Sequence, residues 1–246
     1  TKKEVAALFS RFKKVKLGKE WFYITEKKVK LAKLFNEYLS SGGLPEYLKN
    51  RDNEYLRTVY ENILYKDIIA RYSIKKQKII KELVNMLVTN ISSLFTYNSL
   101  KKSLGLANSI TVKEYISYLN NSYLFFELQK FDYSVRKQLN SPKKIYLIDP
   151  AFSQISGFNF SMNKGRILEN LVFIELMRRG KEIYYYSNKN ECDFLVKEGT
   201  RINGAIQVCY ILNQSNKERE INGLFDVMDK FKLKEAMILT QEQEDE

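Results

Sequence analysis

The last ninety residues alternate between helical and strand-like patterns in an order that few folds accommodate. Residues 164–180 place apolar side chains at helical spacing and end at Gly180. Three strand-like runs, a second helical pattern and a last strand-like run follow: EIYYYS, CDFLVKEG, AIQVCYIL, KEREINGLFDVMDKF and EAMILTQ. This order predicts an α/β unit over residues 156–246 whose middle strands are buried on both faces.

Glu169 interrupts the apolar stripe that Val172, Phe173 and Leu176 form on the first of these helices. A carboxylate in such a place needs a partner, because an unpaired buried charge is costly or is neutralised. Two interpretations stay open: Glu169 is an acid of a metal or active site, or it makes a structural hydrogen bond between helix and loop.

Polar residues also interrupt the strand-like runs. Period-2 alternation places Gln207 and Cys209 on one face of their strand, and Asp193 lies beside them if the neighbouring strand pairs in the expected register. The same alternation turns Cys192 to the face opposite Asp193, which argues against a disulfide between the two cysteines. Both cysteines are therefore predicted to be reduced, small buried residues.

The middle of the chain, residues 51–155, reads as helices followed by a hairpin. Residues 53–72 predict one helix of about twenty residues with Asn53 as N-cap. Three further helical patterns and two strand-like runs come next: KQKIIKELVNMLVTNIS, YNSLKKSLG, ITVKEYISYLNN with Ser109 as cap, YLFFELQKF and KKIYLI. A polar, turn-rich linker over residues 132–142 separates the two strands. Three helices followed by a hairpin with a long tip is the order of a winged helix.

A winged helix would contact nucleic acid through its last helix and its wing. The exposed face of that helix offers one cation beside an acid, which is poor chemistry for reading base edges. Sequence-specific reading, non-specific contact through the wing, and packing against protein alone remain alternatives. The candidate nucleic-acid-binding residues are Lys113, Arg136, Lys137, Lys143 and Lys144.

Composition excludes several chemistries. The chain has no histidine and two cysteines, so it lacks Ser-His and Cys-His dyads and the ligands of a structural zinc site. The net charge of +12 is uneven, because residues 1–34 hold eleven Lys/Arg against three acids. No apolar run approaches the roughly 20 residues that span a bilayer, and charge interrupts the first residues too early for a signal sequence. We expect a cytoplasmic protein without a membrane contact.

Glu169 on a helix, Asp193 near the start of a strand and the Gln207-Val208-Cys209 position together resemble the restriction-endonuclease-like PD-(D/E)xK core. The resemblance implies a site in which Asp193 and Gln207 hold Mg²⁺, with Glu169 as a further acid. Cys209 stands where the family has its catalytic lysine and cannot supply that cation. A nuclease would therefore need a displaced lysine, for which Lys189, Lys197 and Lys217 are the candidates.

The wider chain resembles the carboxyl-terminal region of predicted prokaryotic AAA+ ATPases that carry a nuclease-like domain. The motifs that carry this resemblance follow in family order over residues 30–212: FNEYLSSGGLPEYL, YENILYKDIIARY, SITVKEYISYLNNSYLFFEL, KKIYLIDPAF, GRILENLVFIELMRRG, ECDFLV and AIQVCY. It implies that residues 1–50 belong to the lid that follows the nucleotide-binding core, and that ATP and this ATPase core are partners of the full-length protein. The sequence itself has no P-loop, so we expect no ATP hydrolysis by this chain.

The predicted fold is α+β and multidomain: a helical lid remnant, a winged helix and a restriction-endonuclease-like α/β domain. The leading hypothesis is a non-catalytic regulatory or binding region of an AAA+ ATPase, with possible contact to DNA. The alternatives are an Mg²⁺-dependent nuclease with a displaced lysine and a protein-interaction scaffold. The sequence leaves the oligomeric state open.

Overall fold

The computed structural model describes residues 15–17, 20–22, 25–155, 163–241 and 243, and for 15–28 only the backbone elements. Within these residues the fold is mixed α+β, as predicted. Most of the basic amino-terminal segment, residues 156–162 beside the expected domain boundary, and part of the acidic tail lie outside the described residues. No helix in the described part of the chain is both long and apolar enough to cross a membrane.

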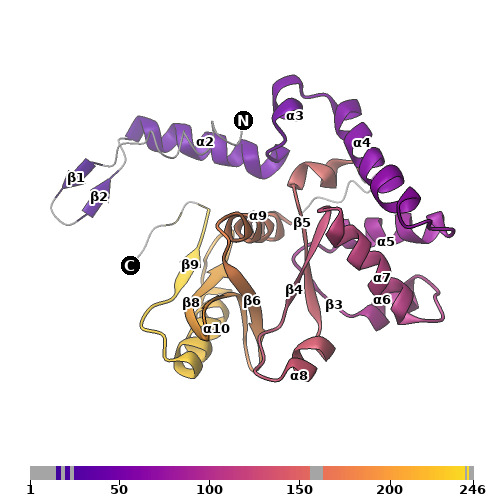
Figure 1. Cartoon of the computed structure of the whole chain (residues 1–246). Helices are drawn as coiled ribbons and strands as arrows, with labels where there is room; N and C mark the ends of the chain where they lie inside the picture. Colours follow the sequence, from indigo (N-terminus) through magenta and orange to yellow (C-terminus); the bar gives the residue numbers. More distant parts are fainter. Residues whose placement is uncertain (1–14, 18–19, 23–24, 156–162, 242, 244–246) are drawn as a thin grey trace.

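The amino-terminal part is a small hairpin followed by helices that lie together at the top of Figure 1. Gly42, with φ +71°, ends the first long helix, and its N–H donates to the carbonyl of Tyr38 at 2.8 Å. The elements are β1 (Val15–Leu17), β2 (Glu20–Phe22), α2 (Thr25–Ser41), α3 (Pro45–Asn50), α4 (Asn53–Asn62) and the π-helix η1 (Ile63–Ala70).

The expected helix over residues 53–72 exists but differs in two ways. Its N-cap is Asp52 rather than Asn53, since the Asp52 carboxylate accepts the N–H of Glu54 at 2.9 Å. From Ile63 it continues as a π-helix of eight residues. A π-helix widens the turn and changes which side chains share a face, and apolar spacing alone does not reveal it.

Four helices and a three-stranded antiparallel sheet form this part of the chain, in the predicted order except for the additional strand β3 and helix α8. The sheet order is β3-β5-β4, with Phe125 opposite Leu147 and Gln129 opposite Lys143. The elements are α5 (Gln77–Thr89), β3 (Leu94–Phe95), α6 (Tyr97–Ser103), α7 (Ser109–Asn121), β4 (Phe125–Gln129), α8 (Val135–Asn140) and β5 (Lys143–Leu147).

Two local expectations for this part were wrong. Asn108, not Ser109, caps α7, because its side chain accepts the N–H of Ile110 at 2.9 Å. The linker between the two long strands is not turns alone: Ser134 accepts the N–H of Lys137 at 3.4 Å and starts the short helix α8.

The carboxyl-terminal part is a four-stranded sheet with a helix against each face. Its order is β6-β7-β8-β9; the first three strands are antiparallel, and β9 pairs in parallel with β8 after the crossover through α10. The elements are η2 (Pro150–Gln154), α9 (Lys164–Arg178), β6 (Glu182–Ser187), β7 (Glu191–Glu198), β8 (Arg201–Val208), α10 (Lys217–Phe231) and β9 (Met237–Leu239). Cys192 and Leu195 pack toward α10, whereas Phe194 packs with the side chains of α9.

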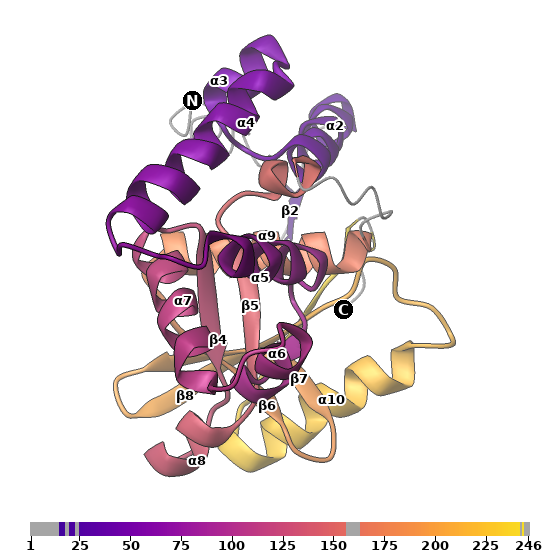
Figure 2. The same cartoon turned by 90° about the vertical axis from the view of Figure 1, so that its right-hand side faces the viewer.

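One hydrophobic core crosses the middle of the chain, and α9 lies at its centre between the upper helices and both larger sheets (Figures 1 and 2). Phe173 of α9 stacks on Tyr146 of β5 with ring centroids 4.0 Å apart. Asn170 of α9 caps the edge of β5, since it accepts the N–H of Leu147 at 2.7 Å and donates to the same residue's carbonyl at 2.9 Å. The three-stranded and four-stranded sheets are therefore packed on a common helix.

Candidate functional site: a lysine among buried acids

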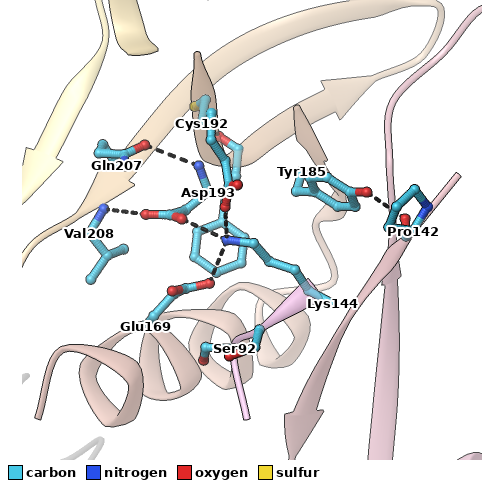
Figure 3. Close-up of polar contacts among 12 residues, drawn as sticks. Ser92, Pro142, Lys144, Glu169, Tyr185, Cys192, Asp193, Gln207 and Val208 are labelled. Atoms are coloured by element: carbon cyan, nitrogen blue, oxygen red, sulfur yellow. Dashed lines mark hydrogen bonds and ion pairs between the residues drawn. The ribbon is translucent and has the colours of Figure 1, made fainter. Parts of the chain in front are cut away.

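Lys144 of β5 reaches across this shared core into the acids of the carboxyl-terminal part (Figure 3). Its side chain is only 3% exposed. The Nζ atom lies 3.0 Å from Oε1 of Glu169, 2.7 Å from Oδ1 of Asp193 and 2.7 Å from Oε1 of Glu191. We refer to these four residues as the lysine–acid cluster.

Strand periodicity explains how the cluster assembles. Glu191 and Asp193 are two apart on β7, so both project from the same face. Lys144 and Tyr146 are likewise two apart on β5, and the Tyr146 hydroxyl donates to Oε1 of Glu169 at 2.7 Å. Glu169 of α9 thus receives hydrogen bonds from two residues of one strand.

Asp193 uses both carboxylate oxygens. Oδ1 accepts from the lysine, and Oδ2 accepts the backbone N–H of Val208 at 2.9 Å. Its own N–H donates to Oε1 of Gln207 at 3.1 Å, and Gln207 Nε2 donates to Oε2 of Glu220 at 2.6 Å. The expected register is confirmed: Asp193 and Gln207 are neighbours, and the amide group of Gln207 is hydrogen-bonded through both its oxygen and its nitrogen.

Burial and charge set the protonation of the cluster. Burial raises the pKa of Glu169 to about 8, repulsion from Asp193 adds to the rise, and Lys144 and Tyr146 oppose it. Burial alone would lower the pKa of Lys144, but the surrounding carboxylates outweigh it and hold that pKa well above its usual range. Burial, with Glu169 beside it, also raises the pKa of the Tyr146 phenol. These shifts keep the lysine charged and favour the protonated form of Glu169.

The residues do not fit Mg²⁺ in this arrangement. Among the described residues, no group of three His, Cys, Asp or Glu side chains is placed to hold a metal ion. Mg²⁺ requires about six oxygen ligands, several of them water, in octahedral geometry. Both expected ligands are engaged elsewhere: Asp193 with Lys144 and Val208, and Gln207 with Glu220.

The cation beside the acids is none of the three expected displaced lysines. Lys197 pairs with Glu182 at 2.7 Å on the protein surface, and Lys189 and Lys217 are exposed. Cys209, at the family's lysine position, directs its thiol to the carbonyl of Ile211 at 3.1 Å. Both cysteines are free, as predicted.

The expected nucleic-acid-binding set is partly wrong. Lys144 is buried and ion-paired within the lysine–acid cluster. Lys143 is also buried, and its Nζ donates to the carbonyls of Leu139 and Ser141 at 2.9 and 3.1 Å. Neither lysine is available to a phosphate. Three members of the set remain exposed: Lys113, Arg136 and Lys137.

Sequence reasoning brought together Glu169, Asp193 and Gln207 but missed Lys144, Glu191 and Tyr146. A signal existed in the spacing, because Lys144 and Tyr146 share a face of one strand, as Glu191 and Asp193 do of another. What the spacing did not reveal is that these two faces meet.

Together, the fold and the site define a mixed α+β protein in which a lysine of the three-stranded sheet forms ion pairs with acids of α9 and of the four-stranded sheet. Residues 32–157, 126 of the 246, match the family described as "Domain of unknown function (DUF8612)", and the chain belongs to this family. The matched region contains Lys144, whereas Glu169, Glu191 and Asp193 lie beyond it. No solved structure matches the chain.

Two curated relatives are similar along most of this chain. The "Uncharacterized protein MJ1544" of Methanocaldococcus jannaschii is 36% identical over 238 residues, covering 92% of this chain and 52% of that protein. An "Uncharacterized protein" of Haemophilus influenzae is 24% identical over 208 residues, covering 81% of this chain and 51% of that protein. The chain thus spans about half the length of these relatives.

Proposed function

We propose that the chain is a non-catalytic regulatory or binding region of a longer protein, and that its nuclease-like acids serve structure. The observation that carries this proposal is the position of Lys144, whose Nζ lies within 3.0 Å of three carboxylates in a place where a nuclease would hold its metal. An ammonium contacts these oxygens without the water ligands that Mg²⁺ keeps for attack on a phosphate.

The longer protein is, in this proposal, an ATPase of the AAA+ superfamily. The support is the resemblance over residues 30–212 and the greater length of both curated relatives. The helices α5–α7 with the β3-β5-β4 sheet would then be its winged helix, and α9 with the four-stranded sheet a degenerate PD-(D/E)xK domain. ATP would bind outside this chain, which has no P-loop.

A cleavage assay tests the non-catalytic role. Labelled single-stranded and duplex DNA would be incubated with the chain and Mg²⁺ or Mn²⁺, beside Asp193→Asn and the control Glu182→Gln, which alters an exposed carboxylate outside the cluster. We expect no cleavage above background in any sample. Cleavage by the wild type and by Glu182→Gln that disappears in Asp193→Asn would refute the proposal.

The second candidate is a metal-dependent nuclease, and the position of Lys144 is also what favours it. In that case Lys144 would be the displaced catalytic cation and would move aside when the metal enters. Lys144→Met should then abolish metal-dependent cleavage. If the cluster is purely structural, the wild type does not cleave and the variant has no cleavage to lose.

A further inference from the structure

A surface cavity of about 610 Å³, widely open to solvent, lies away from the lysine–acid cluster, at the carboxyl-terminal end of α10. Its walls are residues 230–235, residues 200–203 at the turn between β7 and β8, and Tyr133 from the segment that precedes α8. Helix α8 and α10 lie on the same side of the molecule in both views (Figures 1 and 2). The cavity is therefore built where the middle and carboxyl-terminal parts meet.

The walls of this cavity are basic. Four cations, Arg201, Lys230, Lys232 and Lys234, face one carboxylate, Glu235, so the lining carries a net charge of 4 − 1 = +3. In the described part of the chain none of the four pairs with an acid, and Lys230 donates instead to the Tyr186 hydroxyl at 3.0 Å. Cations gathered without counter-charges favour an anionic ligand.

An exposed aromatic ring stands at the same cavity. Tyr133 is 77% exposed although it is large and apolar. Its one ring neighbour within the described residues is the buried Phe131, at an edge-to-face centroid distance of 5.2 Å. Phe131 also packs edge to face on Phe231 of the cavity wall at 5.3 Å, which holds this aromatic group in place. Much of the Tyr133 ring is thus free to stack on a planar ligand.

We propose that this cavity binds a nucleotide unit of single-stranded nucleic acid, with its phosphates on Arg201 and the three lysines and its base stacked on Tyr133. Cationic grooves combined with exposed aromatics are how proteins bind single strands without reading sequence. The volume suits a ligand of nucleotide size, and a base can reach the ring only when it is unstacked from a duplex. The site uses no residue of the lysine–acid cluster, so it stands whether or not that cluster is catalytic.

Fluorescence anisotropy of a fluorescein-labelled oligo-dT, titrated at several salt concentrations, tests the site. Lys232→Gln/Lys234→Gln should reduce the magnitude of the slope of log K against log[salt] by about 1.4, because each phosphate contact on a single strand contributes roughly 0.7. The matched control is Lys75→Gln/Lys76→Gln, which removes two exposed lysines outside the cavity and should leave the slope unchanged. Equal slopes for the two double variants would overturn the proposal.

Tyr133 separates nucleotide binding from simple attraction between charges. Tyr133→Ala should weaken oligo-dT binding roughly 5- to 150-fold, whereas Tyr133→Phe, which keeps the ring, should bind like the wild type. Unchanged binding by Tyr133→Ala, or equal competition by poly-glutamate, would refute the proposed stacking site. If free thymidine monophosphate displaces the labelled oligo-dT as well as unlabelled oligo-dT does at the same nucleotide concentration, the ligand of the cavity is a mononucleotide rather than a strand.

Discussion

Replacing Lys144 by Met tests whether the lysine holds the cluster together. Methionine keeps most of the apolar stem but removes the ammonium, which leaves Glu169, Asp193 and Glu191 without their common partner. Removal of one partner of a buried ion pair costs about 3–5 kcal/mol. That is a large part of the 5–15 kcal/mol typical of a folded domain. We therefore expect a free energy of unfolding lower by about 3–5 kcal/mol at pH 7.5.

Lys143 provides the matched control for this experiment. It precedes Lys144 on β5 and is also buried, but its Nζ donates to two backbone carbonyls, and burial lowers its pKa although Glu127 opposes the shift. Lys143→Met should cost about 1–2 kcal/mol, since it loses hydrogen bonds but leaves no group of carboxylates uncompensated.

Urea unfolding followed by far-UV circular dichroism measures both variants. Lys144→Met should lose more free energy of unfolding than Lys143→Met. This difference should shrink as the pH falls toward 5, because the unpaired carboxylates then take up protons. Adding Asp193→Asn should recover part of the loss, which gives a coupling free energy of about 1–3 kcal/mol in a double-mutant cycle. Equal losses for Lys143→Met and Lys144→Met, or a coupling near zero, would show that the lysine contributes packing alone.

Three further variants test the raised pKa of Glu169 and the close packing at Gly42. The folded-state pKa of Glu169, about 8, is raised above its usual 4.5, so its protonated form contributes stability that is complete below pH 4.5 and lost as the pH rises through 8. The free energy of unfolding of the wild type should therefore fall between pH 5 and 8, and Glu169→Gln should reduce that fall by up to about 1.4 kcal/mol per pH unit in urea unfolding. The same pH slope in both proteins would refute a raised pKa. Gly42 and Gly180 both have positive φ, but a Cβ on Gly42 would lie 1.8 Å from Oδ1 of Asp149, whereas a Cβ on Gly180 meets nothing within 4 Å. Gly180→Ala should cost about 1–2 kcal/mol from strain alone, Gly42→Ala clearly more in the same assay, and equal costs would show that the Asp149 contact yields without penalty.

The order of the longer helices and strands was predictable because local periodicity determines it, whereas the two-residue strand β3 was not predicted. Asp193 and Gln207 were predicted to be neighbours from strand alternation and register, whereas Glu169 was placed with them only by the resemblance to the PD-(D/E)xK core. Features governed by single hydrogen bonds were not predictable: the N-cap of α4 is Asp52 and not Asn53, and a short helix forms where turns were expected.

The role of Lys144 could not be predicted because it depends on how two sheets pack. Lys144 lies in KKIYLI, directly after a polar linker, and an exposed lysine in the wing of a winged helix would have the same sequence surroundings. Burial of the strand on both faces appears only once α9 is placed between the sheets, and Lys144 and Asp193 are 49 residues apart. Spacing within a strand fixes which face a side chain is on, but it says nothing of what that face meets.

The charges of the cluster partly compensate one another. Three carboxylates and one ammonium would carry −3 + 1 = −2 if all were ionised, and a proton on Glu169, which its raised pKa favours, would reduce this to −1. The remaining charge is eased by water, because the Glu191 side chain is 39% exposed. A metal ion among these oxygens would have to displace Lys144, which would break the ion pairs of this lysine with Glu169 of α9 and with Glu191 and Asp193 of β7. We therefore propose that the lysine between the two sheets, and not a loss of acids, is what opposes metal binding in this chain.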